Sequence, residues 1–175
     1  MNRALVALGS NIDGKRNLRE AVRRLSLCCR LVAVSPVYET APVGNTEQPN
    51  FFNAAALIET DLTAAELKAR VLRVIEQEMG RVRTEDKNAP RTIDLDIALF
   101  GHQVLDLGPR RIPDPDILRY PHIAVPLADL APTMRHPEDG RTLQEIAQSL
   151  SASGLVSRPD VVLWPEAIDQ RIKER

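Results

Sequence analysis

The 175-residue chain has two cysteines, 3% aromatic residues and no long apolar run. Cys28 and Cys29 are neighbours, which rarely bridge each other and lack the spacing of metal ligands. A disulfide framework is therefore excluded, and a reducing, cytoplasmic location is expected. Scarce aromatic rings argue against a surface that stacks the bases of single-stranded nucleic acid. No segment is apolar over the length that a membrane-spanning helix needs.

The chain also lacks a charge of one dominant sign. Its net charge is −1 at pH 7, which gives no global attraction to nucleic acid or to an anionic membrane. What is present is a hydrophobic content of 43%, enough for a folded domain with its own core. The apolar start "RALVALGS" leads directly into polar residues, which favours a first strand over a signal peptide.

Hydrophobic periodicity predicts strands at 3–10, 30–40, 51–60 and 92–100, and a helix at 17–27. A second helix is expected between Thr63, which forms a capping box with Glu66, and the C-terminal stop at Gly80. Four of its residues are predicted to form a buried stripe: Leu67, Val71, Val74 and Ile75.

This β-α-β-β-α-β order predicts a mixed α/β (α+β) domain over residues 1–154. A ferredoxin-like core is expected, with a largely antiparallel sheet and helices on its faces. Thr142 and Glu145 form a second capping box for a later helix. Residues 155–175 are interpreted as a C-terminal extension with a short strand and a terminal helix, which packs on the domain or mediates association.

Two acids interrupt the apolar strand "TIDLDIALF" at 92–100. Because alternate residues of a strand share a face, Asp94 and Asp96 point together, with their Cα atoms roughly 6.5–7 Å apart. Two like charges on one face need positive compensation, and paired carboxylates suit Mg²⁺, which prefers oxygen ligands. The alternative is that this face is solvated and that the acids are the polar half of an amphipathic strand.

Basic residues lie just before these acids. Arginine clamps phosphate oxygens in a forked geometry, and acids for metal beside arginines for phosphate are typical of a phosphoryl-transfer site. The alternative is that Glu85 and Asp86 pair with the bases in a solvated loop. The basic residues concerned are Arg81, Arg83, Lys87 and Arg91.

The segment "GSNIDGKR" at 9–16 nearly matches the phosphate-cradling pattern G-x-x-x-x-G-K-[ST]. Gly9, Gly14 and Lys15 fit, but Arg16 stands where a hydroxyl should bind Mg²⁺. A strand-to-helix turn is the favoured interpretation, and a P-loop hydrolase that depends on Lys15 remains an alternative.

Three stretches, "ALGSN", "VYETAPVG…QPNFFNAA" and "GRVR…APRTIDLDIALFG", resemble the 6-hydroxymethyl-7,8-dihydropterin pyrophosphokinase family. These folate-biosynthesis enzymes move a pyrophosphoryl group from ATP to a pterin alcohol. The resemblance implies two Mg²⁺ ions, ATP as co-substrate and a pterin as the second small-molecule partner. It implies no nucleic-acid or membrane partner, and a monomer or weak homodimer is expected.

The resemblance also implies roles for individual residues. Asp94 and Asp96 match the metal ligands, and Arg81 and Arg91 match catalytic basic positions beside the triphosphate. Phe51 would stack on the pterin ring, and Asn53 would hydrogen-bond to its edge. The positions that match nucleotide contacts are Glu76, Arg83, Lys87 and Arg91. Those that match the pterin pocket are Thr40, Val43, Phe51, Asn53 and His122.

Three residues depart from the family pattern. Asp114 stands where a histidine is common near the phosphates, and Tyr120, beside Arg119, stands where an arginine is common. His122 replaces an aromatic residue that closes the pterin pocket. These departures leave open the alternative that the chain is a non-catalytic module, which binds its ligand without turning it over. His102 and His136 are interpreted as loop residues.

Overall fold

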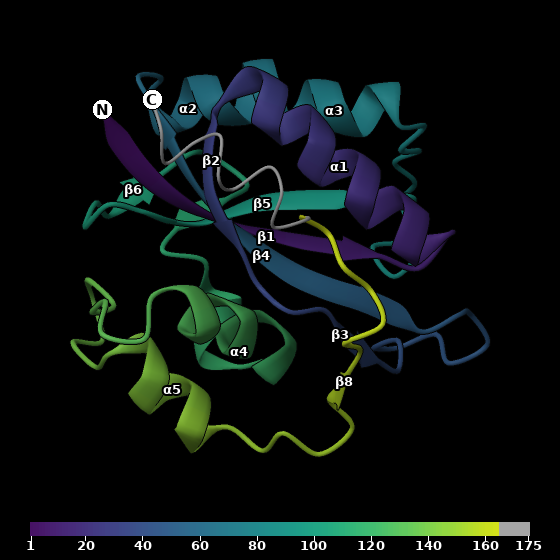
Figure 1. Ribbon diagram of the computed structural model, residues 1–175. Helices are drawn as coiled ribbons and strands as arrows, with labels where there is room; N and C mark the ends of the chain where they lie inside the picture. The colour runs from purple at the N-terminus through teal and green to yellow at the C-terminus, as the bar shows by residue number, and fades with distance from the viewer. Residues whose placement is uncertain (165–175) are drawn as a thin grey trace.

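The computed structural model describes residues 1–164, and the predicted terminal helix lies outside them. One antiparallel sheet has helices on both faces (Figure 1). The elements of the first part are β1 (Asn2–Ser10), α1 (Gly14–Cys28), β2 (Arg30–Val34), β3 (Tyr38–Thr40), β4 (Phe51–Thr60), α2 (Ala64–Glu66), a π-helical segment (Leu67–Leu72), α3 (Arg73–Glu78) and β5 (Asp94–Phe100). Those that follow are β6 (Leu105–Asp106), β7 (Arg111–Ile112), a 3₁₀ helix (Pro115–Leu118), α4 (Pro121–Leu130), α5 (Leu143–Ser149) and β8 (Val156–Ser157).

The strand order is β5-β1-β4-β3-β8, with β2 also paired to β4, and β6 and β7 form a separate hairpin. Every pairing is antiparallel. This confirms the predicted ferredoxin-like core. The segment 30–40 is two strands instead of one, because Pro36 has no N–H to continue the ladder.

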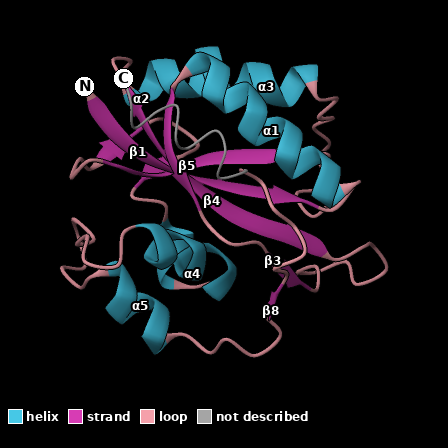
Figure 2. Ribbon diagram, in the orientation of Figure 1, coloured by secondary structure: helices cyan, strands magenta, loops and turns pink. Residues whose placement is uncertain are grey.

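Two hydrophobic clusters lie on opposite faces of the sheet. Helices α1, α2 and α3 cover one face, and their buried residues belong to the same cluster as Val6 and Leu8 of β1. Helices α4 and α5 cover the other face around Leu5 of β1 and Ala55 of β4 (Figure 2). This second face also carries the candidate site, beyond the edge of the α4 cluster.

The helix between β4 and β5 contains a π-helical segment. The capping box of Thr63 and Glu66 is confirmed at its start. A π turn contains one extra residue, so the faces of the helix rotate after it. Leu72 and Glu76 are consequently buried. Val74 is 38% exposed, so its predicted place in the buried stripe is wrong.

Residues 156–164 pack on the domain. Strand β8 pairs with β3, and Val161 and Leu163 are buried in the cluster beneath α1. Arg158 pairs with Glu39 of β3 and with Asp160.

The capping box of the later helix is confirmed at Thr142 and Glu145. Within residues 1–164, no helix is long and apolar enough to cross a membrane.

Candidate active site

The register of three strands places predicted metal-binding and pterin-binding residues in one row. Asn53 of β4 and Asp94 of β5 both lie opposite Gly9 of β1, on either side of it. Since neighbouring strands are about 4.8 Å apart, the Cα atoms of Asn53 and Asp94 are roughly 10 Å apart. A Cβ atom at Gly9 would lie 3.7 Å from Asn53 Oδ1 and 4.0 Å from the Phe51 ring. Gly9 therefore lies between the two groups of residues, within van der Waals reach of the pterin side.

Asp94 is bound on one oxygen only. Arg91 Nη1 donates to Asp94 Oδ2 at 3.0 Å. Asp94 Oδ1 is buried and has no hydrogen-bond partner within residues 1–164, and the same is true of Arg81 Nε nearby. Burial lowers the pKa of Arg81, although the negative charge of Asp94 acts in the opposite direction and raises it. An orphaned acceptor and an orphaned donor suit a cation together with a phosphate oxygen.

Arg91 connects the two halves of the site. Its guanidinium lies 5.8 Å from the centre of the Phe51 ring while it binds Asp94. Arg91 also donates to the backbone oxygen of Lys87. The predicted catalytic arginine thus contacts both the pterin-side aromatic residue and a predicted metal ligand. The Lys87 side chain itself is exposed.

Asn11 holds the loops around this site together, and the sequence interpretation gave it no role. Its Oδ1 accepts from the backbone N–H of Arg91 at 2.8 Å. Its Nδ2 donates to Gln48 Oε1 at 2.7 Å, and Gln48 donates to the backbone oxygen of Asn88 at 2.6 Å. Asn11 is 3% exposed, so its amide must find partners within the protein, but the sequence shows only an asparagine directly after a strand.

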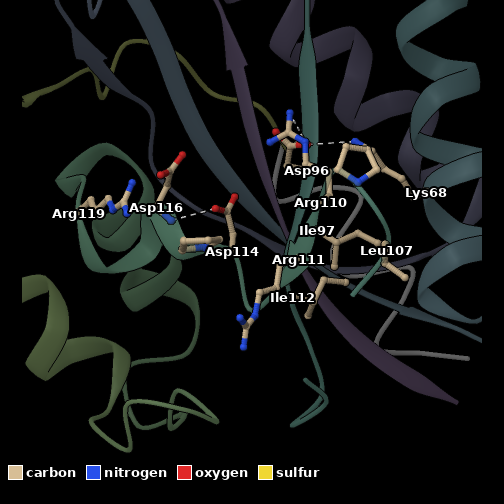
Figure 3. A pocket seen from close by; sticks show the side chains of 12 residues that line it. Lys68, Asp96, Ile97, Leu107, Arg110, Arg111, Ile112, Asp114, Asp116 and Arg119 are labelled. Carbon is tan, nitrogen blue, oxygen red and sulfur yellow. Dashed lines mark hydrogen bonds and ion pairs between the residues drawn. The ribbon is translucent and has the colours of Figure 1, made fainter. Parts of the chain in front are cut away.

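Two positively charged side chains lie beside Asp96, and the sequence interpretation missed both. Lys68 Nζ lies 3.1 Å from Asp96 Oδ1, and Arg110 Nη2 lies 3.5 Å from the same oxygen (Figure 3). Asp96 is the first cause of the raised pKa of Arg110. These side chains line a cavity of about 260 Å³ that also contains Asp114 and Arg119. In the sequence, only the "PRR" stretch before Asp114 pointed to Arg110. Nothing pointed to Lys68, because it lies on a helix that is distant from Asp96 in the chain.

Glu76 is 1% exposed, and protein groups bind both of its carboxylate oxygens. The backbone N–H of Leu95 donates to Oε1 at 2.8 Å, and Arg83 Nη2 donates to Oε2 at 2.7 Å. Glu76 and Arg83 therefore lie together behind β5, and Glu76 supports the strand that carries the acids. Their predicted nucleotide contacts stay predictions.

Four of the five predicted pterin residues lie on β3, β4 and the loop between them, and the fifth, His122, lies on α4. Asn53 Nδ2 donates to Thr40 Oγ1 at 3.0 Å and to the backbone oxygen of Tyr38 at 3.3 Å, which fixes the orientation of its amide. Val43 is 56% exposed in the loop. His122 lies in the first turn of α4, with its ring 5.2 Å from that of Tyr120, and burial lowers its pKa.

Asp114 begins the 3₁₀ helix. Its Oδ1 accepts from the backbone N–H of Asp116 at 2.9 Å, and its own N–H donates to the Ala98 oxygen of β5 at 2.9 Å. Burial raises its pKa to about 6. No group of three or more His, Cys, Asp or Glu residues in the described part of the chain could hold a metal. A metal on Asp94 and Asp96 would thus be completed by water and phosphate, as Mg²⁺ commonly is.

Paired acids beside arginines on one face of a sheet are an arrangement that suits the binding of a polyphosphate with divalent cations. The model of the 7,8-dihydro-6-hydroxymethylpterin-pyrophosphokinase family matches residues 5–132. The chain belongs to this family.

Relatives support this membership. The chain is 42% identical over 163 residues to 2-amino-4-hydroxy-6-hydroxymethyldihydropteridine pyrophosphokinase of Pseudomonas aeruginosa, across 91% of this chain and 98% of the relative. It is 39% identical over 132 residues to the enzyme of that name from Bacillus subtilis, across 74% of this chain and 78% of the relative.

The solved structure of HPPK-DHPS from Plasmodium falciparum with pteroate has a TM-score of 0.67 at 14% identity. The match covers 85% of this chain and 44% of the solved one, and it supports the fold alone. The chain spans less than half of the length of such solved chains.

Proposed function

We propose that the chain transfers pyrophosphate from ATP to 6-hydroxymethyl-7,8-dihydropterin, giving AMP and the pterin pyrophosphate. The observation that carries this function is the row across the sheet, in which Asn53 and Asp94 lie on either side of Gly9. Asn53, whose amide oxygen would accept from the pterin edge, and Asp94, the proposed metal ligand, share one face of the sheet, which supports this reaction. Family membership and the named relatives support the same reaction.

Two Mg²⁺ ions are proposed at Asp94 and Asp96, where they would neutralise the phosphates and align the attacking and leaving oxygens. Asp94 would bind through Oδ1, the oxygen that Arg91 leaves free. Arg81 would donate its unpaired Nε–H to a phosphate oxygen. Glu76 and Arg83 would contact the nucleotide from behind β5, and Lys87 would contact it from the 81–91 loop.

Phe51 would hold the pterin ring by stacking, and Asn53, oriented by Thr40, would hydrogen-bond to its edge. Val43 and His122 would complete the pocket from the 41–50 loop and from α4. The contacts of Asn11 and Gln48 tie the 41–50 and 81–91 loops together. Loops held over the site would exclude water and protect ATP from hydrolysis.

The decisive experiment incubates the chain with ATP, Mg²⁺ and 6-hydroxymethyl-7,8-dihydropterin and separates the nucleotides by chromatography. AMP that appears only when the pterin is present supports the proposal. ADP as the product would instead identify ordinary kinase or ATPase chemistry. Binding of pterin and an ATP analogue by calorimetry, without AMP formation, would identify a non-catalytic binding module.

The P-loop alternative is tested by Lys15→Ala. In the structure, Lys15 lies 3.5 Å from Asp160 and 5.9 Å from the centre of the Phe52 ring, so it is bound to the C-terminal segment. We expect AMP formation by Lys15→Ala within about twofold of the unmodified chain. Loss of activity would revive a P-loop hydrolase.

We propose that the chain acts in the cytoplasm as a monomer or weak homodimer. The large apolar side chains that are exposed in the described residues are spread along the chain, for example Val82 and Val104, which supports this proposal. Sedimentation velocity at micromolar concentration tests this proposal, and a stable dimer would contradict it.

A further inference from the structure

Strand β3 carries part of the proposed pterin pocket, and it has only three residues. Pro36, shortly before it, has no N–H to extend the ladder. On the face of the sheet that carries the site, Asn53 of β4 donates to the backbone oxygen of Tyr38 and to Thr40 Oγ1. Because so short a strand makes few ladder hydrogen bonds, contacts from elsewhere in the chain are needed to hold these pocket residues in register.

The C-terminal segment, residues 156–164, supplies such contacts. Strand β8 pairs with β3 on the side away from β4 (Figure 1), so β3 lies inside the sheet and not at its edge. The backbone N–H of Arg158, directly after β8, donates to the Val37 oxygen at 2.8 Å. Val161 and Leu163 are buried in the cluster beneath α1, so they anchor this segment independently of the Arg158 side chain.

The side chain of Arg158 joins β3 to β4 on the face opposite the pocket. Because alternate residues of a strand point to opposite faces, Glu39 of β3 and its cross-strand partner Phe52 of β4 lie behind the pocket residues. The Arg158 guanidinium pairs with Glu39 and lies 5.4 Å from the centre of the Phe52 ring. One positively charged group therefore contacts both members of this cross-strand pair.

Glu39 also connects Arg158 to the 41–50 loop. Its Oε2 accepts from Arg158 Nη1, and its Oε1 accepts from Asn50 Nδ2 at 3.3 Å. Glu39 lies just before that loop and Asn50 is its last residue, so one carboxylate ties the two ends of the loop together. The side chains of Arg158 and Glu39 are 25% and 23% exposed, so their ion pair is partly shielded from water.

Asp160 fixes the orientation of the Arg158 guanidinium. Arg158 Nε donates to Asp160 Oδ1 and Nη2 donates to Oδ2, each at 2.9 Å. This forked pair leaves Nη1 for Glu39. The planar guanidinium thus serves two acids at once, one on the C-terminal segment and one on β3.

We propose that Arg158 is a positioning residue for the pterin: through Glu39 it fixes β3 and the ends of the 41–50 loop, so the C-terminal segment sets the affinity for the pterin ring. The inference rests on the proposed pterin pocket at Phe51 and Asn53. Arg158 lies on the other face of the sheet, so it acts through these residues and not on the substrate. Its loss should weaken pterin binding and leave nucleotide binding and the chemical step unchanged.

The test is the Kd for 6-hydroxymethylpterin, a fluorescent oxidised analogue of the substrate, titrated in the presence of Mg²⁺ and α,β-methylene ATP, which cannot be cleaved. We expect Arg158→Met to raise this Kd about five- to tenfold, because the pocket is no longer held in its binding geometry. The Kd for α,β-methylene ATP should stay within about twofold, and kcat for AMP formation within about threefold, while the KM for the dihydropterin rises with the pterin Kd. A pterin Kd within about twofold of the unmodified chain, or an equal rise in both Kd values, would overturn the inference.

Arg141→Met is the matched control. Arg141 makes the same kind of forked pair with an acid two positions away, Asp139, and its side chain also donates to Ser149 Oγ. These partners lie in the turn before α5 and in α5 itself, and neither belongs to the strands of the pocket. We expect Arg141→Met to keep the pterin Kd within about twofold of the unmodified chain. A rise equal to that of Arg158→Met would count against a specific role for Arg158.

Glu39→Gln tests the route through Glu39. It should raise the pterin Kd about as much as Arg158→Met, and the double variant should show no further rise, because both changes remove the same ion pair. Rises that multiply in the double variant would show that Arg158 does not act through Glu39. Arg158→Lys can still pair with Glu39, so its Kd should be within about threefold of the unmodified chain. A Kd for Arg158→Lys equal to that of Arg158→Met would also contradict this route.

Phe51→Leu separates failure of the inference from failure of the pterin pocket. If Phe51→Leu leaves the Kd for 6-hydroxymethylpterin unchanged, the proposed pocket itself is wrong. If Phe51→Leu weakens binding but Arg158→Met does not, only the role of Arg158 is wrong. A purely structural arginine would lower the melting temperature in Arg158→Met without changing the pterin Kd, and this outcome would count against the inference. Should Arg158→Met fail to fold, Glu39→Gln provides the same Kd comparison.

Discussion

Glu76 accepts a hydrogen bond from the backbone N–H of Leu95 at 2.8 Å, midway between the two acids of β5. Because β5 is the edge strand of the sheet, this N–H has no neighbouring strand to pair with. Lys68 donates to the oxygen of the same residue at 2.6 Å. Two helix side chains therefore pair with the edge strand at Leu95, where a further strand would otherwise be needed.

Glu76→Leu should destabilise the fold. It leaves the Leu95 N–H buried without an acceptor and removes the partner of Arg83, so the free energy of unfolding should fall by about 2–4 kcal/mol. Urea denaturation followed by circular dichroism measures the change. Glu78→Leu is the control, because Glu78 is exposed and, within residues 1–164, pairs only with Arg24, and its effect should stay within about 0.5 kcal/mol. Equal effects would contradict the role given to Glu76.

Asp94→Asn should reduce the kcat for AMP formation by at least about a thousandfold, because an amide cannot replace a charged metal ligand. The fold should survive, because Asn retains an oxygen that can accept from Arg91. The measurement is steady-state AMP release at saturating substrates, with circular dichroism as a check on folding. Asp61→Asn, at an exposed carboxylate, should remain fully active. Activity retained by Asp94→Asn would rule out the metal assignment.

Phe51→Leu should raise the KM for the pterin by about ten- to a hundredfold, since stacking on an aromatic ring contributes about 1–3 kcal/mol per base-like ring. The KM for ATP should change less than about threefold. Initial rates with each substrate varied in turn give both constants. Phe52→Leu is the comparison, because the neighbouring ring points to the α1 side and packs against the core beneath that helix. A matching rise in both variants would argue for a general packing effect.

Asp114 should make stability depend on pH. Burial raises its pKa from 3.8 to about 6, so between these values the folded state holds a proton that the unfolded chain has lost. The free energy of unfolding therefore falls as pH rises through this window. Asp114→Asn, which can still cap the 3₁₀ helix, should be more stable than the unmodified chain above pH 6, by about 1–2 kcal/mol once solvent screening is allowed for.

The gain from Asp114→Asn should be small near pH 4, because the folded carboxyl is protonated there and the unfolded one, with a pKa of 3.8, is close to half protonated. Thermal melts at pH 4, 5, 6 and 7 in the absence of nucleotide give the profile. A gain that is constant across this range would show that the cause is packing and not the charge of the buried carboxylate.

Local patterns in the sequence were enough to predict the order of elements from β1 to β5, apart from the break at Pro36, the capping boxes at Thr63 and Thr142, and the shared face of Asp94 and Asp96. These features depend on period-two and period-3.6 repeats and on neighbours within four residues. The family resemblance extended the interpretation to the pterin side, where Asn53 and Thr40 are in fact hydrogen-bonded.

Only the tertiary structure decided which distant groups meet these acids. The π turn rotates the helix so that Glu76 is buried and Val74 is exposed, and no local pattern signals the extra residue. Lys68 and Arg110 reach Asp96 from 28 and 14 positions away in the chain, through sheet register and helix packing. Contacts across such separations depend on how elements dock, so the acids could be predicted from the sequence and the cations that hold them could not.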